Sequence, residues 1–449
     1  MNTRDDTFRK FLVVWFGQFI SAIGSGLTAF ALGVYVFQRT QSAMDFSSII
    51  LFSFLPSFIL LPFGGVLADK FDRKRMMVLG DLGAIAGIMF ILSIMLWGNI
   101  KVWHIYVGVA LSSVFAAVQN PAYKAAVSDM VSEEFYSRAS GLIQLAASAQ
   151  YLISPIIAGI LMNAFDIRPV LIIDIMTFVF AAAAVLVIKK QDDAFQNKHE
   201  EQEFLLDLAE SFQYLFSQKG ILLLVLLTSM VCFYVGVLQS LFGPMMLTMT
   251  NSTVLGTALP IMASGMLFSS LFIGIHGTGK KMVVTLSMFL GLAGLFYALM
   301  GLFTTVALMA TSGFLFFITL PFVNTSLEVL IRTNVDNEKQ GRTWSLVAAI
   351  SQIGYILAFG SAGFLADHFF SPLLMPNGAL ALNVGIIVGT GPGRGIGFMF
   401  ILSGLIVAIL GCIIGRVRII AELDVKRVIE NREDQPQPAN NLSGITQTV

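Results

Sequence analysis

The sequence predicts an all-α membrane protein with twelve transmembrane helices. Of its 449 residues, 56% are hydrophobic and only 12% are charged, and the mean hydropathy is +0.81. Because about one quarter of the residues of a soluble domain are charged, this composition excludes an ordinary soluble enzyme. The charges also cluster at intervals, and the stretches between them are long enough for the ~20 apolar residues of a helical span.

The twelve spans follow from these uncharged stretches in chain order. Eight stretches each fit one helix: 11–38, 46–68, 82–100, 102–123, 139–165, 169–188 (interrupted only by Asp174), 343–366 and 395–415. The stretches 220–279 and 282–327 are too long for one helix, and each contains a polar or small-residue break. We therefore expect a hairpin of two helices in each, the second one completed to about residue 331.

The positive charges predict how the chain is oriented. Positively charged residues near the ends of spans stay on the cytoplasmic side of a membrane. If the N-terminus is inside, all but four of the 27 Lys and Arg residues lie inside, the exceptions being Arg39, Lys101, Arg168 and Arg394. We expect a multi-pass protein of a bacterial cell membrane with both termini cytoplasmic.

The spans divide the chain into four parts. We expect an N-terminal six-helix bundle over 1–188, a cytoplasmic linker over 189–219, a C-terminal six-helix bundle over 220–416 and a largely disordered tail over 417–449. Within the linker, 203–216 has a helical apolar stripe that predicts an amphipathic helix on the membrane surface, the alternative being a solvated linker. The stripe consists of Phe204, Leu208, Phe212 and Leu215. The glycines of 389–395 indicate a tight entry into the last helix rather than a phosphate loop.

An internal repeat relates the two halves. Residues 131–165 align with 335–369 at a constant offset, with nine identical pairs that include charged and small residues. The pairs are Val131/Val335, Glu134/Glu338, Arg138/Arg342, Leu142/Leu346, Tyr151/Tyr355, Ala158/Ala362, Gly159/Gly363, Leu161/Leu365 and Phe165/Phe369. The same offset pairs Asn120 with Asn324. The chain is therefore predicted to be two parallel six-helix repeats, an arrangement that secondary transporters use.

The loop after the second span contains the segment 64–75, GGVLADKFDRKR. This segment is similar to the signature G-x-L-A-D-x-x-G-R-K/R, with Asp72 where glycine is usual, and through it the chain resembles the major facilitator superfamily, in particular its macrolide-efflux-like drug exporter branch. The resemblance implies that Asp69 faces the start of helix 11 and that it forms, with Gly65 and Arg73, a latch closing the cytoplasmic side. Asp129 is an expected partner of Arg73. A loop that only sets topology is the alternative.

A second resemblance concerns helix 5 of proton-driven antiporters. Gly141, Pro155 and Gly159 match that family pattern, whereas other positions carry larger residues than the usual glycines. Small residues permit close helix packing and Pro155 bends the helix, which would bias how the cavity closes. A generic small-residue packing face is the alternative.

By resemblance, helices 1, 4, 7 and 10 line a substrate cavity. Polar groups are costly in lipid and therefore usually face the interior. The expected cavity residues are Gln18, Gln119, Asn120, Tyr123, Gln239 and Asn324. This aromatic, weakly charged wall suits a bulky amphiphile. For each of these residues, helix packing is the alternative role.

We therefore predict a secondary active transporter, not an enzyme, that exports a hydrophobic or amphiphilic, drug- or macrolide-like molecule by proton antiport. The expected partners are this substrate, protons and the lipid bilayer, with no nucleic acid, and the expected state is a monomer. With only four His and two Cys, we expect no cofactor and no metal site. The candidate proton sites are Glu328, Asp174 and Asp81, none expected to be deeply buried. The alternatives are a proton-coupled symporter for metabolite uptake and a membrane-embedded sensor or lipid-modifying enzyme.

Overall fold

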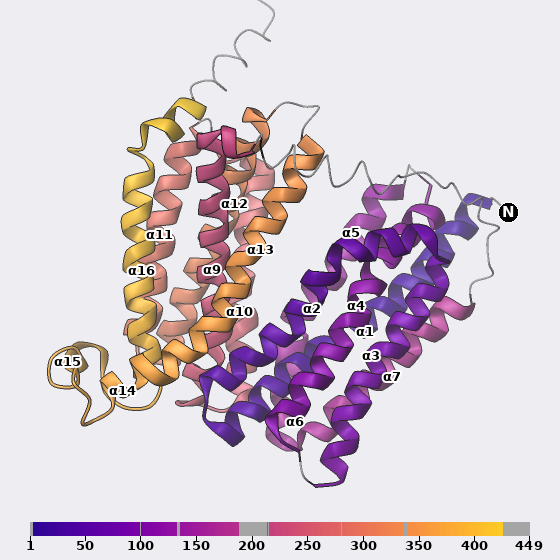
Figure 1. Cartoon of the computed structure of the whole chain (residues 1–449), viewed down its shortest axis with the longest axis horizontal. Helices are drawn as coiled ribbons and strands as arrows, with labels where there is room; N and C mark the ends of the chain where they lie inside the picture. Colours follow the sequence, from indigo (N-terminus) through magenta and orange to yellow (C-terminus); the bar gives the residue numbers. More distant parts are fainter. Residues whose placement is uncertain are drawn as a thin grey trace, which may run out of the picture.

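The computed structural model consists of helices that run roughly alongside one another (Figure 1). It describes residues 3–98, 100–132, 135–187, 213, 215–279, 281–335 and 340–424, with the backbone alone at 3–7, 61–70, 129, 137, 341 and 342. In this part of the chain, twelve helical segments are long and apolar enough to cross a membrane. The prediction of an all-α membrane protein with twelve spans is confirmed.

The first six spans pack against one another as one group. They are α1 (Thr3–Thr40), α2 (Ala43–Lys70), α3 (Arg73–Leu96), α4 (Val102–Met130), α5 (Tyr136–Leu152) with α6 (Ser154–Ala164), and α7 (Ile167–Val187). The fifth span is divided at Ile153, because Pro155 lacks the N–H that would continue the helical hydrogen bonds. The helix is thus interrupted beside Pro155, where the sequence predicts a bend.

The last six spans form the second group. They are α9 (Lys219–Leu247), α10 (Ser252–His276), α11 (Met282–Leu302), α12 (Val306–Asn334), α13 (Gln340–Leu365) continued by the π-helical turn η3 (Ala366–Phe370) and α14 (Ser371–Leu374), and α16 (Arg394–Ile414). The short helix α15 (Gly385–Val388) lies in the segment that joins α14 to α16. The region 367–394 is thus partly helical, not a simple loop.

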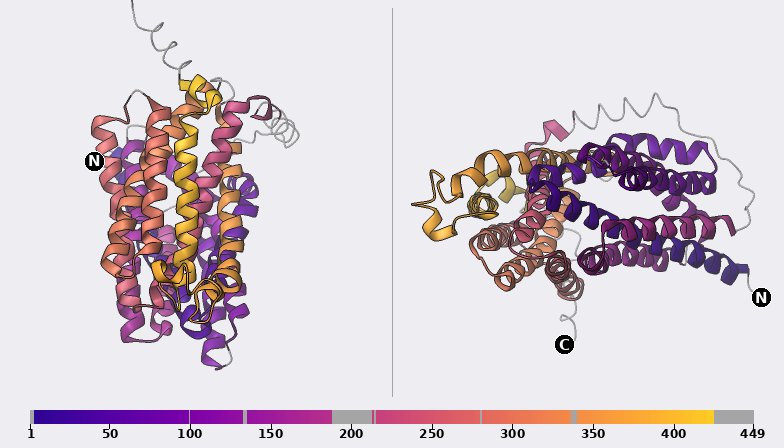
Figure 2. Two further views of the ribbon diagram at one scale, coloured as in Figure 1. Left: turned by 90° about the vertical axis from the view of Figure 1, so that its left-hand side faces the viewer. Right: turned by 90° about the horizontal axis from the view of Figure 1, so that it is seen from below.

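The two groups meet at one end of the molecule and diverge toward the other (Figure 1). We call the end that holds residue 3 and residue 424 the terminal end, and the end that holds residues 371–393 the loop end. Figure 1 and the right-hand view of Figure 2 show the segment around α15 projecting to the side of the helices, at the loop end. Contacts between the groups join α2 to α13 and α9, and α5 and α6 to α10.

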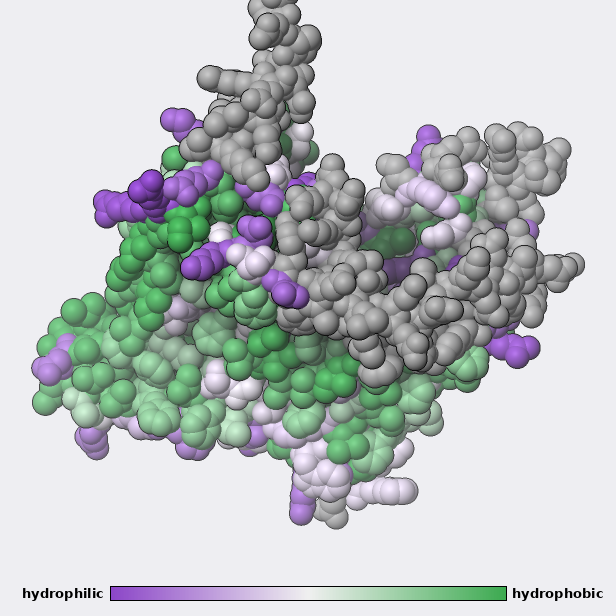
Figure 3. All heavy atoms as spheres, turned by 45° about the horizontal axis from the view of Figure 1, so that its top comes forward, coloured by the Kyte–Doolittle hydropathy of each residue, from purple (hydrophilic) through white to green (hydrophobic). Residues whose placement is uncertain are grey.

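Hydrophobic side chains cover much of the flank of the molecule in Figure 3, and hydrophilic ones gather near its ends. This distribution fits a protein whose flank lies in lipid. Some predicted span limits were too short, because charged residues at the ends of helices were excluded from them. The third span begins at Arg73 rather than at 82, and the eleventh runs on to Leu374.

Arg394 begins α16 with a buried side chain. Its guanidinium donates hydrogen bonds to the carbonyl oxygens of Gly301, Leu302 and Phe303, where α11 ends. These last carbonyls have no partner within their own helix and carry partial negative charge, so a cation there is stabilising. The preceding Gly393 caps α16 in the left-handed region, with φ at 78°, so the expected tight entry into the last helix is present.

The predicted linker and tail are only partly described. Phe204, Leu208 and Phe212 of the predicted amphipathic helix lie outside the described residues, and Leu215 is buried against the second group. The first part of the predicted disordered tail is instead helical over 418–424, because Ile420 is buried in the same core. Residues 425–449 lie outside the described part.

Candidate functional site

Asp367 on η3 binds the start of α2 at the loop end. Its Oδ2 accepts hydrogen bonds from Ser42 Oγ at 2.8 Å and from Met44 N at 2.9 Å, and its Oδ1 accepts one from Ala43 N at 3.1 Å. The first N–H groups of a helix have no partner within the helix and carry partial positive charge, which a carboxylate satisfies. Asp367 therefore ties the second group of helices to the first.

Two glycines make close backbone contacts between the groups. A Cβ atom on Gly363 of α13 would overlap Met44 and Ala43 of α2. A Cβ atom on Gly159 of α6 would lie 2.6 Å from the carbonyl oxygen of Ser252 on α10, and Ser252 Oγ donates a hydrogen bond of 3.1 Å to Gly159 O. Since Gly159 and Gly363 are paired by the internal repeat, the groups are joined at the loop end by two equivalent helix contacts.

Aromatic side chains extend the contact between α2 and α13 toward the middle of the molecule. The ring centroid of Phe54 on α2 lies 5.7 Å from that of Phe359 and 6.1 Å from that of Tyr355, both on α13. Nearer the loop end, the ring of Phe46 on α2 lies against Gly33 of α1 and Gly243 of α9. Side chains therefore fill the space between the groups from the loop end to about half the depth of α2.

The predicted latch is at the other end of α2. The side chains of Gly65, Asp69 and Asp129 lie outside the described residues, so the structure does not test their contacts. The helix ends at Lys70, and Asp72 caps the next helix by accepting a hydrogen bond of 3.1 Å from Arg75 N. Asp69 and Arg73 are consequently not on one continuous helix. Arg73 donates a hydrogen bond of 3.2 Å to the carbonyl oxygen of Ala125 on α4.

The residues of the helix 5 motif have different surroundings. A Cβ atom on Gly141 would meet nothing within 4 Å, so this glycine carries no close packing. Gly256 of α10, in contrast, lies against the carbonyl oxygen of Pro155 and against Gly159. Pro155 and Gly159 therefore lie at the joint between the groups, whereas Gly141 does not.

Polar stripes run along α4 and α12 near the terminal end. All six side chains are exposed: Asn120, Lys124 and Ser128 on α4, and Asn324, Glu328 and Arg332 on α12. The two stripes occupy equivalent positions, because the repeat that pairs Asn120 with Asn324 also pairs the others. Neither asparagine amide has a hydrogen-bond partner among the described residues.

These stripes lie on a different face from the apolar exposed residues of the same helices. At about 100° per residue, Asn120 points roughly 135° away from the exposed apolar side of α4. That side consists of Trp103, Val107, Leu111 and Val114. Asn324 lies similarly opposite Leu308 and Thr311 on α12. Each helix thus has one exposed face that suits lipid and another that does not.

The other predicted cavity residues are Gln18, Gln119, Tyr123 and Gln239, and their surroundings differ. Gln18 and Gln119 bind each other, since Gln119 Nε2 donates a hydrogen bond of 2.7 Å to Gln18 Oε1. Tyr123 packs against two small apolar clusters, one around Val14 and one around Phe11 of α1. Gln239 on α9 is exposed and stands apart from them. The sequence therefore predicted these polar residues individually, but the structure joins only two of them.

The three candidate proton sites differ sharply in burial. Asp81 and Asp174 are each 1% exposed, so the expectation that neither is deeply buried was wrong. Glu328 is 53% exposed and pairs with Arg332 at 2.6 Å. The expectation rested on how far each acid lies from the end of its span. That distance does not determine burial, because neighbouring helices cover Asp81 and Asp174 at any depth.

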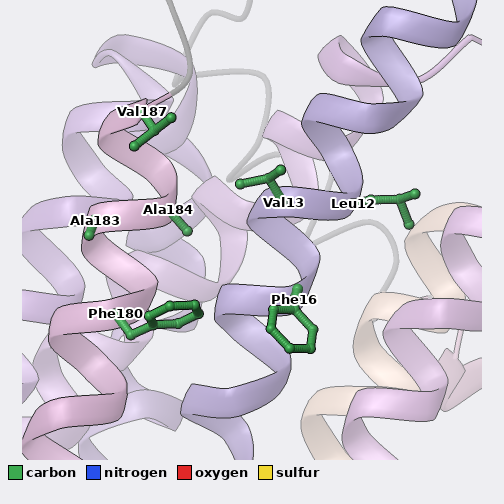
Figure 4. Close-up of a pocket in the computed structure, with 7 residues that line it drawn as sticks. All are labelled: Leu12, Val13, Phe16, Phe180, Ala183, Ala184 and Val187. Carbon is green, nitrogen blue, oxygen red and sulfur yellow. The ribbon is translucent and has the colours of Figure 1, made fainter.

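An apolar groove of about 420 Å³ lies between α1 and α7 on the flank of the first group (Figure 4). Its lining has no polar side chain: Leu12, Val13, Phe16, Phe180, Ala183, Ala184 and Val187. Most of these side chains are exposed, so the groove suits contact with lipid chains rather than a polar ligand.

In the described part of the chain, no three His, Cys, Asp or Glu side chains group as a metal site.

Asp367 was missed by the sequence reasoning, although a signal for it exists. The pattern G-x-L-A-D of Gly65–Asp69 recurs at Gly363–Asp367, near the end of α13. Ser42, which precedes α2, is as far from Asp69 as Gln340, which begins α13, is from Asp367. A search of the second half for the same pentapeptide finds it.

The family model described as Major Facilitator Superfamily matches residues 14–359. The chain belongs to this superfamily. Its relatives include macrolide efflux protein A of Streptococcus pyogenes, 25% identical over 432 residues that cover 93% of this chain and 98% of the relative. Macrolide efflux protein A of Enterococcus faecalis is 26% identical and covers 68% of this chain and 96% of the relative. This superfamily member is therefore a multi-pass membrane transporter rather than an enzyme.

Solved structures of other superfamily members share the fold. The nucleoside transporter NupG superposes with a TM-score of 0.68 at 14% identity, covering 90% of this chain and 99% of that one. A bacterial homologue of the human lysosomal transporter Spinster gives 0.71 at 11% identity, covering 95% and 99%. At these identities the likeness establishes the major facilitator fold alone.

Proposed function

We propose that this transporter exports a hydrophobic or amphiphilic, macrolide-like molecule from the cytoplasm in exchange for protons. Relatives named as macrolide efflux proteins match nearly the whole chain, which supports this substrate class. The distribution of Lys and Arg supports a cell-membrane orientation in which the terminal end is cytoplasmic. In this orientation the divergent ends of the two groups face the cytoplasm (Figure 1).

The observation that carries the proposal is the pair of polar stripes on α4 and α12. The amides of Asn120 and Asn324 have no hydrogen-bond partner among the described residues and lie on the helix faces opposite the apolar sides. An amide in lipid is costly, so these faces line the space between the groups, where they offer hydrogen bonds to a bound molecule. Gln18, Gln119, Tyr123 and Gln239 add further polar atoms. The largely apolar wall between them suits an amphiphile.

Export requires a second state in which the loop end opens and the terminal end closes. The recurrence of G-x-L-A-D supports a reciprocal arrangement of two latches on α2 and α13. Asp367 holds the start of α2 in the state with the terminal end open. Asp69 would hold the first N–H groups of α13, at Gly341 and Arg342, when the terminal end closes. Each latch is worth about 1–2 kcal/mol in a partly buried setting, which is enough to bias two states.

The reciprocity follows from the directions of the helices. The chain runs toward the terminal end in α2 and toward the loop end in α13, so the two helices are antiparallel. The glycine of each pentapeptide lies four residues before its aspartate, and Gly363 already packs on the start of α2. Gly65 would make the corresponding contact with α13. In this scheme Arg73 and Asp129 act beside Asp69 at the cytoplasmic end.

Transport assays test the proposal. Cells that lack their own drug pumps and express this chain should accumulate less radiolabelled erythromycin than cells that express a Gly159→Ala variant at equal membrane abundance. In inside-out vesicles, an imposed proton gradient, acidic inside, should drive uptake of the same macrolide. Equal accumulation in both cell lines would contradict export, and uptake that ignores the gradient would contradict proton exchange.

A further inference from the structure

The carboxyl group of Asp81 is buried in the middle of the first group of helices. Its side chain is 1% exposed, and Oδ2 accepts a hydrogen bond of 3.2 Å from Gln18 Nε2 on α1. Among the described residues, no Lys, Arg or His forms an ion pair with it. A buried carboxylate without a cation is costly, so such a group is suited to take up a proton.

Gln18 connects Asp81 to a cavity helix. Its Oε1 accepts the hydrogen bond of 2.7 Å from Gln119 Nε2, so that three side chains from α3, α1 and α4 form one chain of hydrogen bonds. Gly80 makes room for this arrangement, because a Cβ atom there would overlap the side chain of Gln119. Gln119 directly precedes Asn120 of the exposed stripe on α4.

The other two acids lack such a connection. The Thr177 hydroxyl near Asp174 makes its shorter bond, 2.7 Å, to the backbone carbonyl oxygen of Asp174 and lies 3.4 Å from the carboxylate. Both residues are on α7. Asp174 also lies against Gly24 and Thr28 of α1, but neither of these residues carries an amide or links it to α4. Glu328 already has a cation, Arg332, at 2.6 Å. Asp81 alone of the three acids combines burial, the lack of an ion pair and a link to amides of two cavity helices.

We propose that Asp81 is the proton site of the transporter and that Gln18 and Gln119 relay its protonation state to the substrate. This inference rests on the proposed proton exchange and adds the residue and the physical link. Gln18 and Gln119 are positioning residues in this scheme, because neither one holds the proton.

The link is a reversal of hydrogen-bond direction. The charged carboxylate accepts from Gln18 Nε2, and Gln18 Oε1 accepts from Gln119, which leaves Gln119 Oε1 to face a ligand as an acceptor. A protonated Asp81 donates its O–H, so the Gln18 amide turns its oxygen toward Asp81 and its Nε2 toward Gln119. Gln119 then offers its oxygen to Gln18 and its N–H groups to the ligand. Proton binding therefore changes which hydrogen bonds the substrate can make.

The proton balance of the cycle is simple. With the terminal end open, the O–H bond of Asp81 breaks and the proton passes to water in the cytoplasmic cavity. With the loop end open, a proton from outside water bonds to the carboxylate. A proton thus moves inward as a substrate molecule moves outward, and nothing is oxidised or reduced.

The charged and titratable groups around Asp81 are few. On its own helix, Lys74 lies about two turns toward the terminal end and donates to the carbonyl oxygen of Leu186. On α4, the phenol of Tyr123 lies one turn from Gln119, and Lys124 is exposed. On α7 the group is Asp174, nearer the loop end. Between Lys10 and Tyr35, α1 has no titratable side chain.

The first test detects the proton directly and needs no substrate. Infrared difference spectra of the full chain in lipid, recorded between acidic and alkaline pH, should contain the carbonyl stretch of a protonated buried carboxyl group. This band should be lost in Asp81→Asn, remain in Asp174→Asn and shift in Gln18→Leu, because its hydrogen-bond partner is gone. A titrating band that survives Asp81→Asn unchanged would overturn the proposal, and so would the absence of any titrating band.

The second test distinguishes uptake driven by the proton gradient from the binding and exchange of substrate. In inside-out vesicles, Asp81→Asn should lose uptake of radiolabelled erythromycin driven by the proton gradient, yet should retain exchange of labelled for unlabelled macrolide across the membrane. Asp174→Asn, the matched control, should retain both. Gradient-driven uptake at the wild-type rate in Asp81→Asn would refute the assignment. A wild-type protein that ignores the gradient would refute proton exchange itself, whereas the infrared band would still report whether Asp81 binds a proton.

Discussion

Ser42 Oγ donates a hydrogen bond of 2.8 Å to Oδ2 of Asp367, and this bond joins residues 325 positions apart in the chain. It is one of three bonds by which a single carboxylate holds the start of α2. No other charged side chain makes a hydrogen bond between the two groups among the described residues at the loop end. The bond therefore gives the state with the terminal end open a contact that the opposite state must break.

We predict that Asp367→Asn shifts the protein toward the state with the loop end open. Asparagine lacks the charge, and its side-chain N–H₂ cannot accept from backbone N–H groups, so the loss is about 1–2 kcal/mol, or roughly tenfold in the ratio of the two states. Spin labels at 165 and 304, one in each group at the loop end, should report longer distances. Asp166→Asn changes an acid at the same end that pairs with Arg168, and it should leave these distances unchanged.

Asp69→Asn should have the opposite effect on the same distances. The variant loses the contact proposed to hold the terminal end closed, so it should populate the state with the terminal end open and should export poorly. We expect normal membrane insertion, because the positive charges that set topology remain. Wild-type export at equal membrane abundance would mean that this signature only sets the topology.

Two alanine substitutions in the helix 5 motif should distinguish a glycine that close helix packing requires from a glycine that it does not require. Gly159→Ala places a methyl group 2.6 Å from the carbonyl oxygen of Ser252, so it should separate α6 from α10 and strongly reduce transport. Gly141→Ala meets nothing within 4 Å and should transport normally. The comparison requires equal amounts of both proteins in the membrane. Similar activity of the two variants would exclude a role for the α6–α10 contact.

Replacing Asn120 or Asn324 with leucine should change which compounds are exported. Each substitution removes the proposed hydrogen bonds to bound molecules and enlarges the apolar surface of the proposed cavity, so resistance to the more polar macrolides should fall more than resistance to the apolar ones. The measurement is the resistance profile of expressing cells across a series of compounds. Asn163→Leu, at an exposed asparagine of α6, serves as the control. If only the yield of folded protein changed, the two amides would be packing residues.

Thiol labelling should establish the orientation. In a chain without Cys232 and Cys412, single cysteines at positions 72, 200 and 380 should divide into two classes. An impermeant reagent added to intact cells should modify position 380 only, because the proposed orientation places the terminal end in the cytoplasm. Labelling at position 72 in intact cells would reverse the assignment.

The sequence predicted the fold well because lipid imposes a simple rule on length and hydropathy. Ten stretches with at most one charge gave twelve spans, because two of them are long enough for a hairpin of helices. The repeat also paired Gly159 with Gly363, which the structure places at two equivalent helix contacts. Span limits were less accurate, since Arg73 and Asp81 were excluded from a helix that includes both. A charge count identifies where a helix leaves lipid but not where its hydrogen bonds end.

The arrangement of polar side chains was harder to predict. Asp81 was not expected to be deeply buried, because the sequence gives position along a helix and not the cover provided by other helices. The bond from Gln18 to Asp81 depends on how α1 is rotated against α3, which hydropathy does not encode. Asp367 was overlooked because two of its three partners are backbone N–H groups, so that only the recurrence of G-x-L-A-D in the sequence points to it.

The contact of Arg394 with the end of α11 bears on how the protein is made. A chain enters the membrane from its N-terminus onward during synthesis, so α16 is the last span to leave the ribosome. Until then, the carbonyl oxygens of Gly301, Leu302 and Phe303 lack the guanidinium that satisfies them in the finished molecule. The second group of helices is thus completed only by its final span. A chain that stops before Arg394 leaves these carbonyl oxygens without the guanidinium, and its second group of helices stays incomplete.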